Sequence, residues 1–189
     1  MRYAPFIILA AIIAYFFIDK PLTLWLSHYD LVAFKVVTKL GDAAFWVVPS
    51  LLLYLYFKKS SPQKAKKALY VFGSVAISGI VVDILKPIIG RARPKELLHH
   101  HFYGFDPFTF KASFWSMPSG HSATAFSGFV ALAFLFPKYR YLFFSLATLT
   151  ALSRVLLTKH YLSDVLVGST IGALTAWILY KKIFVTIKT

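Results

Sequence analysis

Residues 117–136 read MPSGHSATAFSGFVALAFLF, and this stretch decides the fold class. Its one ionisable side chain, His121, lies near its start, and only uncharged residues follow. An α-helix needs about 20 residues to cross a hydrocarbon core about 30 Å thick. The stretch therefore predicts a membrane-spanning helix that opens on a polar Pro-Ser-Gly-His segment.

Five other stretches are similarly apolar, and they cover roughly residues 4–18, 43–57, 68–85, 141–157 and 161–180. Of the 189 residues, 58% are hydrophobic and only 15% are charged. Soluble domains average about 45–50% apolar and about 25% charged residues, so this chain has too little polar surface to cover a water-soluble globule. We expect a single domain over residues 1–189, an all-α integral membrane bundle of about six transmembrane helices.

Residues 21–42 mix apolar and basic side chains, with Leu24 and Phe34 interleaved with Lys35 and Lys39. This composition predicts a helix that lies in the membrane interface. A backward extension of the second span is the alternative. The first span could pass for a signal peptide, but no small-x-small cleavage site follows it, so we expect a retained anchor.

Positive charge predicts the orientation of the bundle. The chain carries 21 Lys and Arg residues against 7 Asp and Glu. The cations lie between apolar runs rather than on one face, which favours lipid head groups over nucleic acid as partners. The densest cluster of lysines lies at residues 58–67, and Arg2 and Lys188 lie near the two ends. By the positive-inside rule we expect a multi-pass protein of the bacterial inner membrane, with both termini cytoplasmic and residues 86–116 facing the periplasm.

Three polar segments interrupt the apolar pattern: KPIIGRARP at residues 86–94, PSGH at 118–121 and SRVLLTKHYLSD at 153–164. Because successive spans alternate in direction, the end of the third, the start of the fourth, the end of the fifth and the start of the sixth share one membrane face. Ionisable groups at membrane depth are costly and are usually functional. The topology therefore predicts one site built from all three segments.

The cations and the helix start in these segments suit a phosphoryl group. Lys86, Arg93 and Arg154 supply positive charge, and the planar fork of arginine matches phosphate. A helix that begins at the PSGH segment would point its free amides, including those of Ser119 and Gly120, at an anion. Any one of these residues alone could be a snorkelling anchor or a helix cap. Their joint occurrence on one face favours an anion-handling catalytic site.

The two histidines suit nucleophilic and acid–base chemistry. His160 and Asp164 are four residues apart, so they share one face of a helix. A carboxylate on one ring nitrogen can fix the tautomer and leave the other nitrogen as a nucleophile. His121, at the start of the neighbouring span, lies on the same membrane face.

The combined pattern Lys86-x6-Arg93-Pro94, PSGH at 118–121 and Ser153-Arg154-x5-His160-x3-Asp164 resembles the three-part signature of the type 2 phosphatidic acid phosphatase family. The resemblance implies an integral membrane phosphatase that uses neither metal nor cofactor. It implies that His160 forms a phosphohistidine, that His121 acts as acid and then base, and that Asp164 orients His160. It assigns the phosphate oxygens to Lys86, Arg93, Ser119, Gly120 and Arg154.

The substrate implied is a phosphorylated or diphosphorylated membrane lipid. Lipid A 1-phosphate and undecaprenyl pyrophosphate are favoured, with phosphatidylglycerophosphate next. Arg91, Lys95 and Lys111 lie in the basic outer loop and would suit a polyanionic head group. The alternative function is a non-enzymatic lipid-phosphate transporter or binding protein, which needs the cations but not the two histidines. The oligomeric state is left open.

A few other residues carry weaker expectations. Asp83 lies one helical turn before Lys86 and is expected to pair with it or with another cation of the bundle. His99–His101 are expected to form a solvated loop tip or a substrate rim, because three adjacent histidines need not converge on one metal ion. Trp46 and Trp115, near the starts of spans, are expected to anchor the membrane interface.

Overall fold

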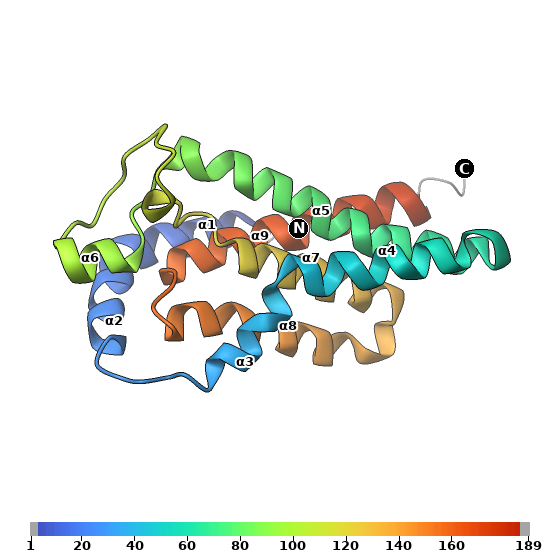
Figure 1. Cartoon of the computed structure of the whole chain (residues 1–189), viewed down its shortest axis with the longest axis horizontal. Coiled ribbons are helices and arrows are strands. Elements are labelled where there is room, and N and C mark those ends of the chain that lie inside the picture. The colour runs from blue at the N-terminus through green and yellow to red at the C-terminus, as the bar shows by residue number, and fades with distance from the viewer. Residues whose placement is uncertain (1–3, 186–189) are drawn as a thin grey trace.

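A computed structural model describes residues 4–185, which are helical apart from turns and loops and contain no β-strand. The predicted all-α class is confirmed. The longer helices are α1 (Ala4–Ile13), α2 (Asp19–Leu26), α4 (Ala43–Ser60), α5 (Pro62–Ile89), α7 (Gly120–Leu135), α8 (Arg140–Leu156) and α9 (Leu162–Tyr180), and the short ones are α3 (Phe34–Thr38) and α6 (Pro94–His100). A π-helical turn joins α1 to α2, and a second one extends α9. Figure 1 shows the long helices packed side by side.

Three helical segments are long and apolar enough to cross a membrane: Phe6–Leu26, Pro62–Ile89 and Leu162–Val185. Residues 34–41 and α4 make a possible fourth span, bent by 47°. Helices α7 and α8 have 16 and 17 residues. At about 1.5 Å per residue they are shorter than a hydrocarbon core of about 30 Å. The number of helices that cross the membrane fully therefore stays a prediction. The orientation also stays a prediction, and Arg2 and Lys188, two of the charges used to predict it, lie outside the described residues.

The predicted interfacial helix over residues 21–42 is wrong. The first helix continues past residue 18 to Leu26, because the π-helical turn before Pro21 adjusts the backbone hydrogen bonds that this proline would otherwise interrupt. Residues 34–41 instead lead into α4, as in the alternative interpretation. The chain bends between them at Asp42, whose backbone is extended.

Helix α7 lies at the centre of the bundle and packs against α4, α5, α8 and α9. Its contact with α9 is close because Gly168 and Gly172 of α9 face its backbone. A Cβ at Gly168 would overlap the carbonyl oxygen of Ser119, and one at Gly172 would overlap that of Ala123. Small residues four apart let helix backbones approach in a membrane. This glycine spacing is readable in the sequence and would have predicted the contact.

Trp46 is buried in the core, so its predicted role as an interface anchor is wrong. Its ring lies over Gly128, where an added Cβ would come 2.5 Å from Trp46 Cδ2. The indole N–H donates to the carbonyl oxygen of Leu40 at 2.8 Å, which ties the bend before α4 to the core. Trp115 donates to the carbonyl oxygen of Thr109 at 2.9 Å, and its interfacial role stays a prediction.

Paired glycine substitutions test the α7–α9 contact. We expect Gly172→Ala to lower the melting temperature of the detergent-solubilised protein, because the methyl group would separate the two helices, and overpacking typically costs about 1–3 kcal/mol. The control is Gly79→Ala on α5, where an added Cβ meets nothing within 4 Å. There we expect an unchanged or higher melting temperature, because alanine favours helix by about 1 kcal/mol. Equal melting temperatures for the two variants would contradict the contact.

Candidate active site

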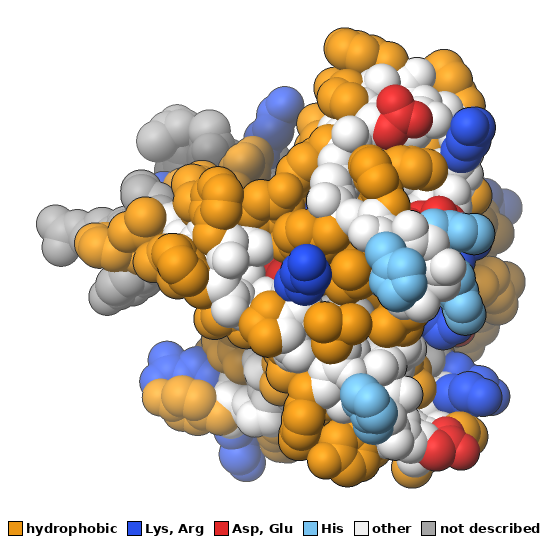
Figure 2. Space-filling view, turned by 90° about the vertical axis from the view of Figure 1, so that its left-hand side faces the viewer, with side chains coloured by type: hydrophobic (Ala, Val, Ile, Leu, Met, Phe, Trp, Pro, Cys, Tyr) orange, Lys and Arg blue, Asp and Glu red, His pale blue; other side chains and the backbone are white. Residues whose placement is uncertain are grey.

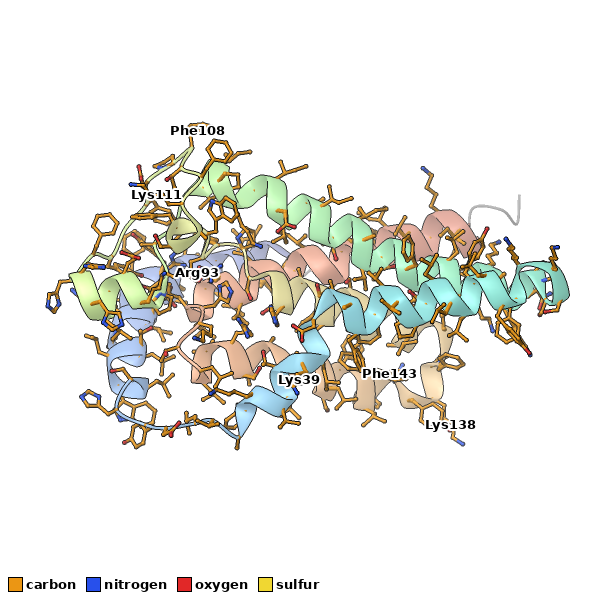
Figure 3. The ribbon with its side chains drawn as sticks, viewed as in Figure 1. Lys39, Arg93, Phe108, Lys111, Lys138 and Phe143 are labelled. Carbon is orange, nitrogen blue, oxygen red and sulfur yellow. The ribbon has the colours of Figure 1, made fainter. Side chains whose placement is uncertain are left out.

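The three predicted polar segments meet at one end of the bundle. Lys86 lies near the end of α5, Ser119 caps the start of α7, Arg154 lies in the last turn of α8, and His160 precedes α9. Arg93 lies just before α6, at the same end of the molecule (Figure 3). In the end-on view of Figure 2, histidine, lysine and arginine side chains lie among hydrophobic ones.

His160 is held by a backbone carbonyl. Its Nδ1 lies 2.7 Å from the carbonyl oxygen of Ser116, which can only accept, so Nδ1 carries the proton and the neutral ring keeps its lone pair on Nε2. Asp164 Oδ2 is 3.6 Å from the same Nδ1, too far for a hydrogen bond. The prediction that Asp164 fixes the tautomer directly is therefore wrong. The sequence analysis missed Ser116, whose contribution comes from its backbone.

Asp164 instead supports the residues around His160. It is fully buried. Its Oδ2 accepts from the hydroxyl of Ser116 at 2.5 Å and from the amide of Tyr161 at 2.9 Å. Its Oδ1 accepts from Arg91 Nη1 at 2.5 Å. The carboxylate thus acts on His160 through Ser116 and through its own charge.

Burial lowers the pKa of His160 below its usual value. The negative charge of Asp164 opposes this shift, whereas the positive charges of Arg154 and Arg93 add to it. The imidazole is therefore neutral near pH 7, as a nucleophile must be.

His121 has a partner that the sequence analysis missed. Its Nε2 lies 2.8 Å from Oδ1 of Asp42, the residue at the bend before α4. Gly41 allows this approach, because an added Cβ there would come 2.9 Å from the Cβ of His121. No sequence periodicity links residues 42 and 121. An acidic residue at the start of a span was the only available signal.

The two arginines keep donors unused inside the site. The Nε atoms of Arg93 and Arg154 are buried and have no hydrogen-bond partner among the described residues. Arg154 is positioned by Nη1, which donates to the hydroxyl of Thr38 at 2.8 Å. Burying an unpaired donor is costly, so these groups fit a site that receives an acceptor from outside. A phosphoryl group supplies several such acceptors.

Lys86 lies over the start of α7. Its Nζ would be 3.4 Å from a Cβ added at Gly120, and it forms an ion pair with Asp83 at 2.7 Å. The predicted pairing of these two side chains is confirmed. Asp83 is 72% exposed, so it is a partner that an anionic ligand could replace.

The PSGH segment meets its prediction only in part. The amide of Ser119 was predicted to be free for an anion. It instead donates to the backbone carbonyl of Asp164 at 3.1 Å. The hydroxyl of Ser119 accepts from Ser122 at 2.9 Å. The amides of Gly120 and His121 lie in the first turn of α7, where the helix offers them no acceptor.

Arg91 does not belong to the head-group surface, contrary to prediction. It is 1% exposed and forms ion pairs with Asp19 at 2.7 Å and Asp164 at 2.5 Å. Burial alone would lower its pKa, but these carboxylates outweigh that effect and raise it, so Arg91 stays charged. Asp19 was not predicted either, although a carboxylate within an apolar span is a usual sign of function.

The remaining loop residues are exposed. Lys95 and Lys111 are accessible to solvent, and Phe108 and Lys111 lie on the loop between α6 and α7 (Figure 3). His99 and His100 end the short α6 rather than forming a loop tip. Within residues 4–185, no group of three His, Cys, Asp or Glu side chains is placed to hold a metal ion.

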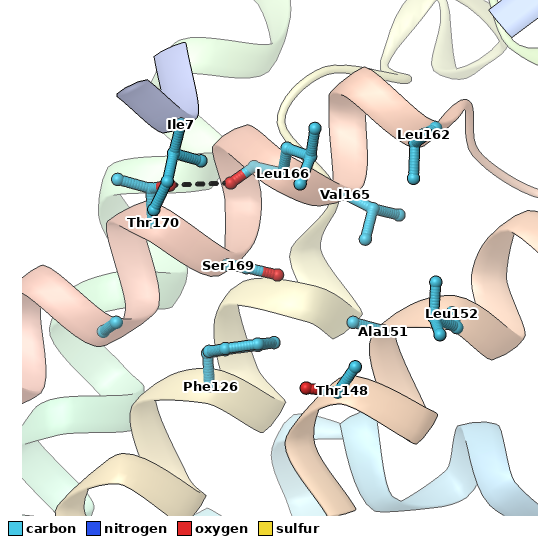
Figure 4. Close-up of a pocket in the computed structure, with 11 residues that line it drawn as sticks. Ile7, Phe126, Thr148, Ala151, Leu152, Leu162, Val165, Leu166, Ser169 and Thr170 are labelled. Atoms are coloured by element: carbon cyan, nitrogen blue, oxygen red, sulfur yellow. Dashed lines mark hydrogen bonds between the residues drawn. The ribbon is translucent and has the colours of Figure 1, made fainter. Parts of the chain in front are cut away.

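An apolar cavity of about 220 Å³ lies beside the site, between α1, α7, α8 and α9 (Figure 4). One wall is formed by α9, from Leu162 to Ala173, which spans roughly 16 Å at 1.5 Å per residue. Leu162 is two residues beyond His160. Ala151 and Phe126 line the opposite side. The cavity therefore follows the apolar face of α9, and Leu162 at its edge is close in sequence to His160.

Known structures share this fold. The crystal structure of the first transmembrane PAP2 type phosphatidylglycerolphosphate phosphatase from Bacillus subtilis superposes with a TM-score of 0.68, at 23% identity, over 97% of this chain and 99% of that one. The crystal structure of Aquifex aeolicus LpxE gives 0.65, also at 23% identity, over 86% and 94%.

Among curated proteins, the lipid A 1-phosphatase of Rhizobium etli is 38% identical over 151 residues, 73% of this chain and 65% of that protein. The undecaprenyl-diphosphatase BcrC of Bacillus subtilis is 28% identical over 82% of this chain and 77% of its own length. The chain thus spans slightly less than two thirds of the Rhizobium protein. The family model of the PAP2 superfamily matches residues 67–188, which hold all three polar segments, and the chain belongs to this superfamily.

Proposed function

We propose that this protein is a lipid phosphatase that hydrolyses a phosphate ester or diphosphate of a membrane lipid through a phosphohistidine, without a metal ion. The observation that carries the proposal is the arrangement of His160. Its ring is neutral, its Nδ1–H is held by the Ser116 carbonyl, and two half-buried arginines, whose buried Nε donors are unused, act on it. This combination suits a nucleophile that attacks an anionic phosphoryl group.

In the first step, Nε2 of His160 forms a bond to phosphorus as the bond from phosphorus to the lipid oxygen breaks. His121 gives a proton to the departing oxygen, and Asp42, 2.8 Å from its Nε2, holds the ring and leaves Nδ1 for the transfer. In the second step, His121 takes a proton from water, whose oxygen attacks phosphorus and releases phosphate from His160. The charge on the ring is greatest between the two steps, where the nearby Asp164 carboxylate stabilises it.

The cations bind the phosphoryl oxygens in this proposal. Arg93 and Arg154 would use their free Nε donors, and Lys86 would exchange Asp83 for the substrate. The amides of Gly120 and His121 in the first turn of α7 would add backbone donors. Ser119 would contribute through its hydroxyl, because its amide is already bonded. Phosphoryl transfer needs little beyond such positioning and charge.

The favoured substrate is lipid A 1-phosphate, because the Rhizobium etli relative at 38% identity is named a lipid A 1-phosphatase. Undecaprenyl pyrophosphate follows, given the similarity to BcrC, and phosphatidylglycerophosphate comes next. Lys95 and Lys111 are exposed at the same end of the molecule and would suit a head group with several negative charges. We place the site on the periplasmic side of the bacterial inner membrane from the charge distribution of the loops.

The first prediction concerns the nucleophile. Purified protein should release phosphate from a panel of lipid phosphates in EDTA, and His160→Ala should reduce the rate by at least about 1,000-fold, because no other side chain can form the intermediate. His99→Ala, at an exposed histidine on α6, is the matched control and should keep full activity. Folded wild-type protein that binds these lipids but releases no phosphate would favour the transporter or binding protein.

The second prediction concerns pH. His160 must be neutral to attack, and burial lowers its pKa, so kcat/KM should stay high below pH 6.5 and fall only as the pH drops through that lowered pKa. In the free protein, burial and the charge of Arg154 lower the pKa of His121 to about 4. Bound phosphate should raise this pKa, so loss of the His121 proton should give an alkaline limb in kcat and a bell-shaped profile. The measurement is kcat and kcat/KM for one lipid from pH 4 to 10. A flat profile would contradict this division of roles.

The third prediction concerns the lipid chain. We propose that the cavity along α9 receives a chain of the substrate. Ser169→Phe should fill it and raise KM for long-chain lipid phosphates, whereas hydrolysis of a soluble aryl phosphate should be unchanged, since that substrate has no chain to place. Ser169→Ala, which leaves the cavity open, is the control. An equal effect of Ser169→Phe on both substrates would show that the cavity does not bind the chain.

A further inference from the structure

We propose that Asp19, on the first helix, is a positioning residue of the active site: it holds Arg91 against Asp164 and so determines how Ser116 and Asp164 support His160. This inference rests on the proposed phosphatase function. Asp19 lies outside residues 67–188, which the family model matches. The proposal therefore extends the active site to a helix that contributes none of the signature residues.

The contacts of Asp19 all point toward the start of α9. Its side chain is fully buried. Oδ2 accepts from Arg91 Nη2 at 2.7 Å and from the hydroxyl of Ser163 at 2.5 Å, and Oδ1 accepts from the amide of Ser163 at 3.1 Å. A buried carboxylate needs several donors to remain ionised, and these two residues supply them.

Arg91 is fixed between two carboxylates. Nη2 donates to Asp19, and Nη1 donates to Asp164 at 2.5 Å and to the hydroxyl of Ser163. The rings of Tyr161 and Tyr15 lie 4.4 and 5.0 Å from its guanidinium carbon. The guanidinium therefore has one orientation, set by both acids together.

Short contacts lead from this group to the nucleophile. Arg91 holds Oδ1 of Asp164, Oδ2 of Asp164 accepts from the hydroxyl of Ser116 at 2.5 Å, and the carbonyl of Ser116 accepts from His160 Nδ1. If Asp19 were neutral, Arg91 would keep only Asp164 as a charged partner. The guanidinium could then shift, and Asp164 and Ser116 would shift with it.

Charge gives Asp19 a role beyond that of a structural contact. Asp19, Arg91 and Asp164 together carry one net negative charge, close to a ring that becomes positive when it takes up the phosphoryl group. The other charged or titratable groups that act on His160 are Arg93, Arg154 of α8 and His121 of α7. Removing the charge of Asp19 should therefore slow formation of the intermediate and leave substrate binding by these cations intact.

The test compares Asp19→Asn with Thr23→Val, a nearly isosteric change at a buried residue one turn further along α2. We measure kcat, KM, the pH profile and the melting temperature in detergent. Asp19→Asn should lower kcat by at least about tenfold, change KM by less than about twofold and move the acid limb to lower pH, because protonated His160 loses a favourable charge. Thr23→Val should match the wild type in kcat and pH profile.

A second variant covers the case in which Asp19→Asn does not fold. Ser163→Ala removes the hydroxyl between Asp19 and Arg91 without changing charge, so it should lower kcat and leave the acid limb in place. If Asp19→Asn folds and keeps the wild-type kcat and pH profile, the positioning role is overturned. If Asp19→Asn does not fold, a wild-type kcat in Ser163→Ala overturns it. No turnover by the wild type would instead refute the phosphatase function, and the positioning role with it.

Discussion

The site depends on how closely α7 approaches α9. Gly168 and Gly172 leave no side chain between the two backbones, and the amide of Ser119 can therefore donate to the carbonyl of Asp164 at 3.1 Å. This bond joins the PSGH segment to the segment that carries His160. In a membrane, where water does not drive helices together, such backbone contact is a main source of association. The α7–α9 contact that packs the bundle therefore also fixes the position of the segment carrying His121 relative to the segment carrying His160.

The second constraint is a buried arginine. Arg91 would be too costly to bury alone, and it is compensated by Asp19 from α2 and Asp164 from α9. The compensation links three parts of the chain that are far apart in sequence. It also places two carboxylates and one guanidinium, with one net negative charge, next to the residues that hold His160. Arg93 and Arg154 add positive charge that acts on the same ring. In the proposed mechanism, the arginines would favour attack on an anion and the carboxylates would stabilise the resulting positive ring.

The surface and the cavity suit a substrate that stays in the bilayer. Large apolar side chains are exposed along the helices, such as Phe16 on the first helix, Tyr56 on α4 and Ile80 on α5. The cationic site lies at one end of the bundle, and the apolar cavity lies along α9, which begins at that end. A lipid could place its phosphate beside His160 while a chain remains among apolar side chains. A soluble phosphate ester would use only the first of these two surfaces.

The sequence by itself determined the helical class and the meeting of the three polar segments, because apolar character and helix periodicity are local properties and helices that alternate in direction bring fixed ends together. It could not assign Arg91, Asp19, Asp42 or Ser116. Arg91 looked like one more loop cation, yet its partners lie 72 and 73 residues away. Only tertiary packing decides such contacts, because burial and the neighbours of a side chain depend on which helices touch. The same packing turned Trp46 inward and placed a carbonyl, rather than a carboxylate, on the ring of His160.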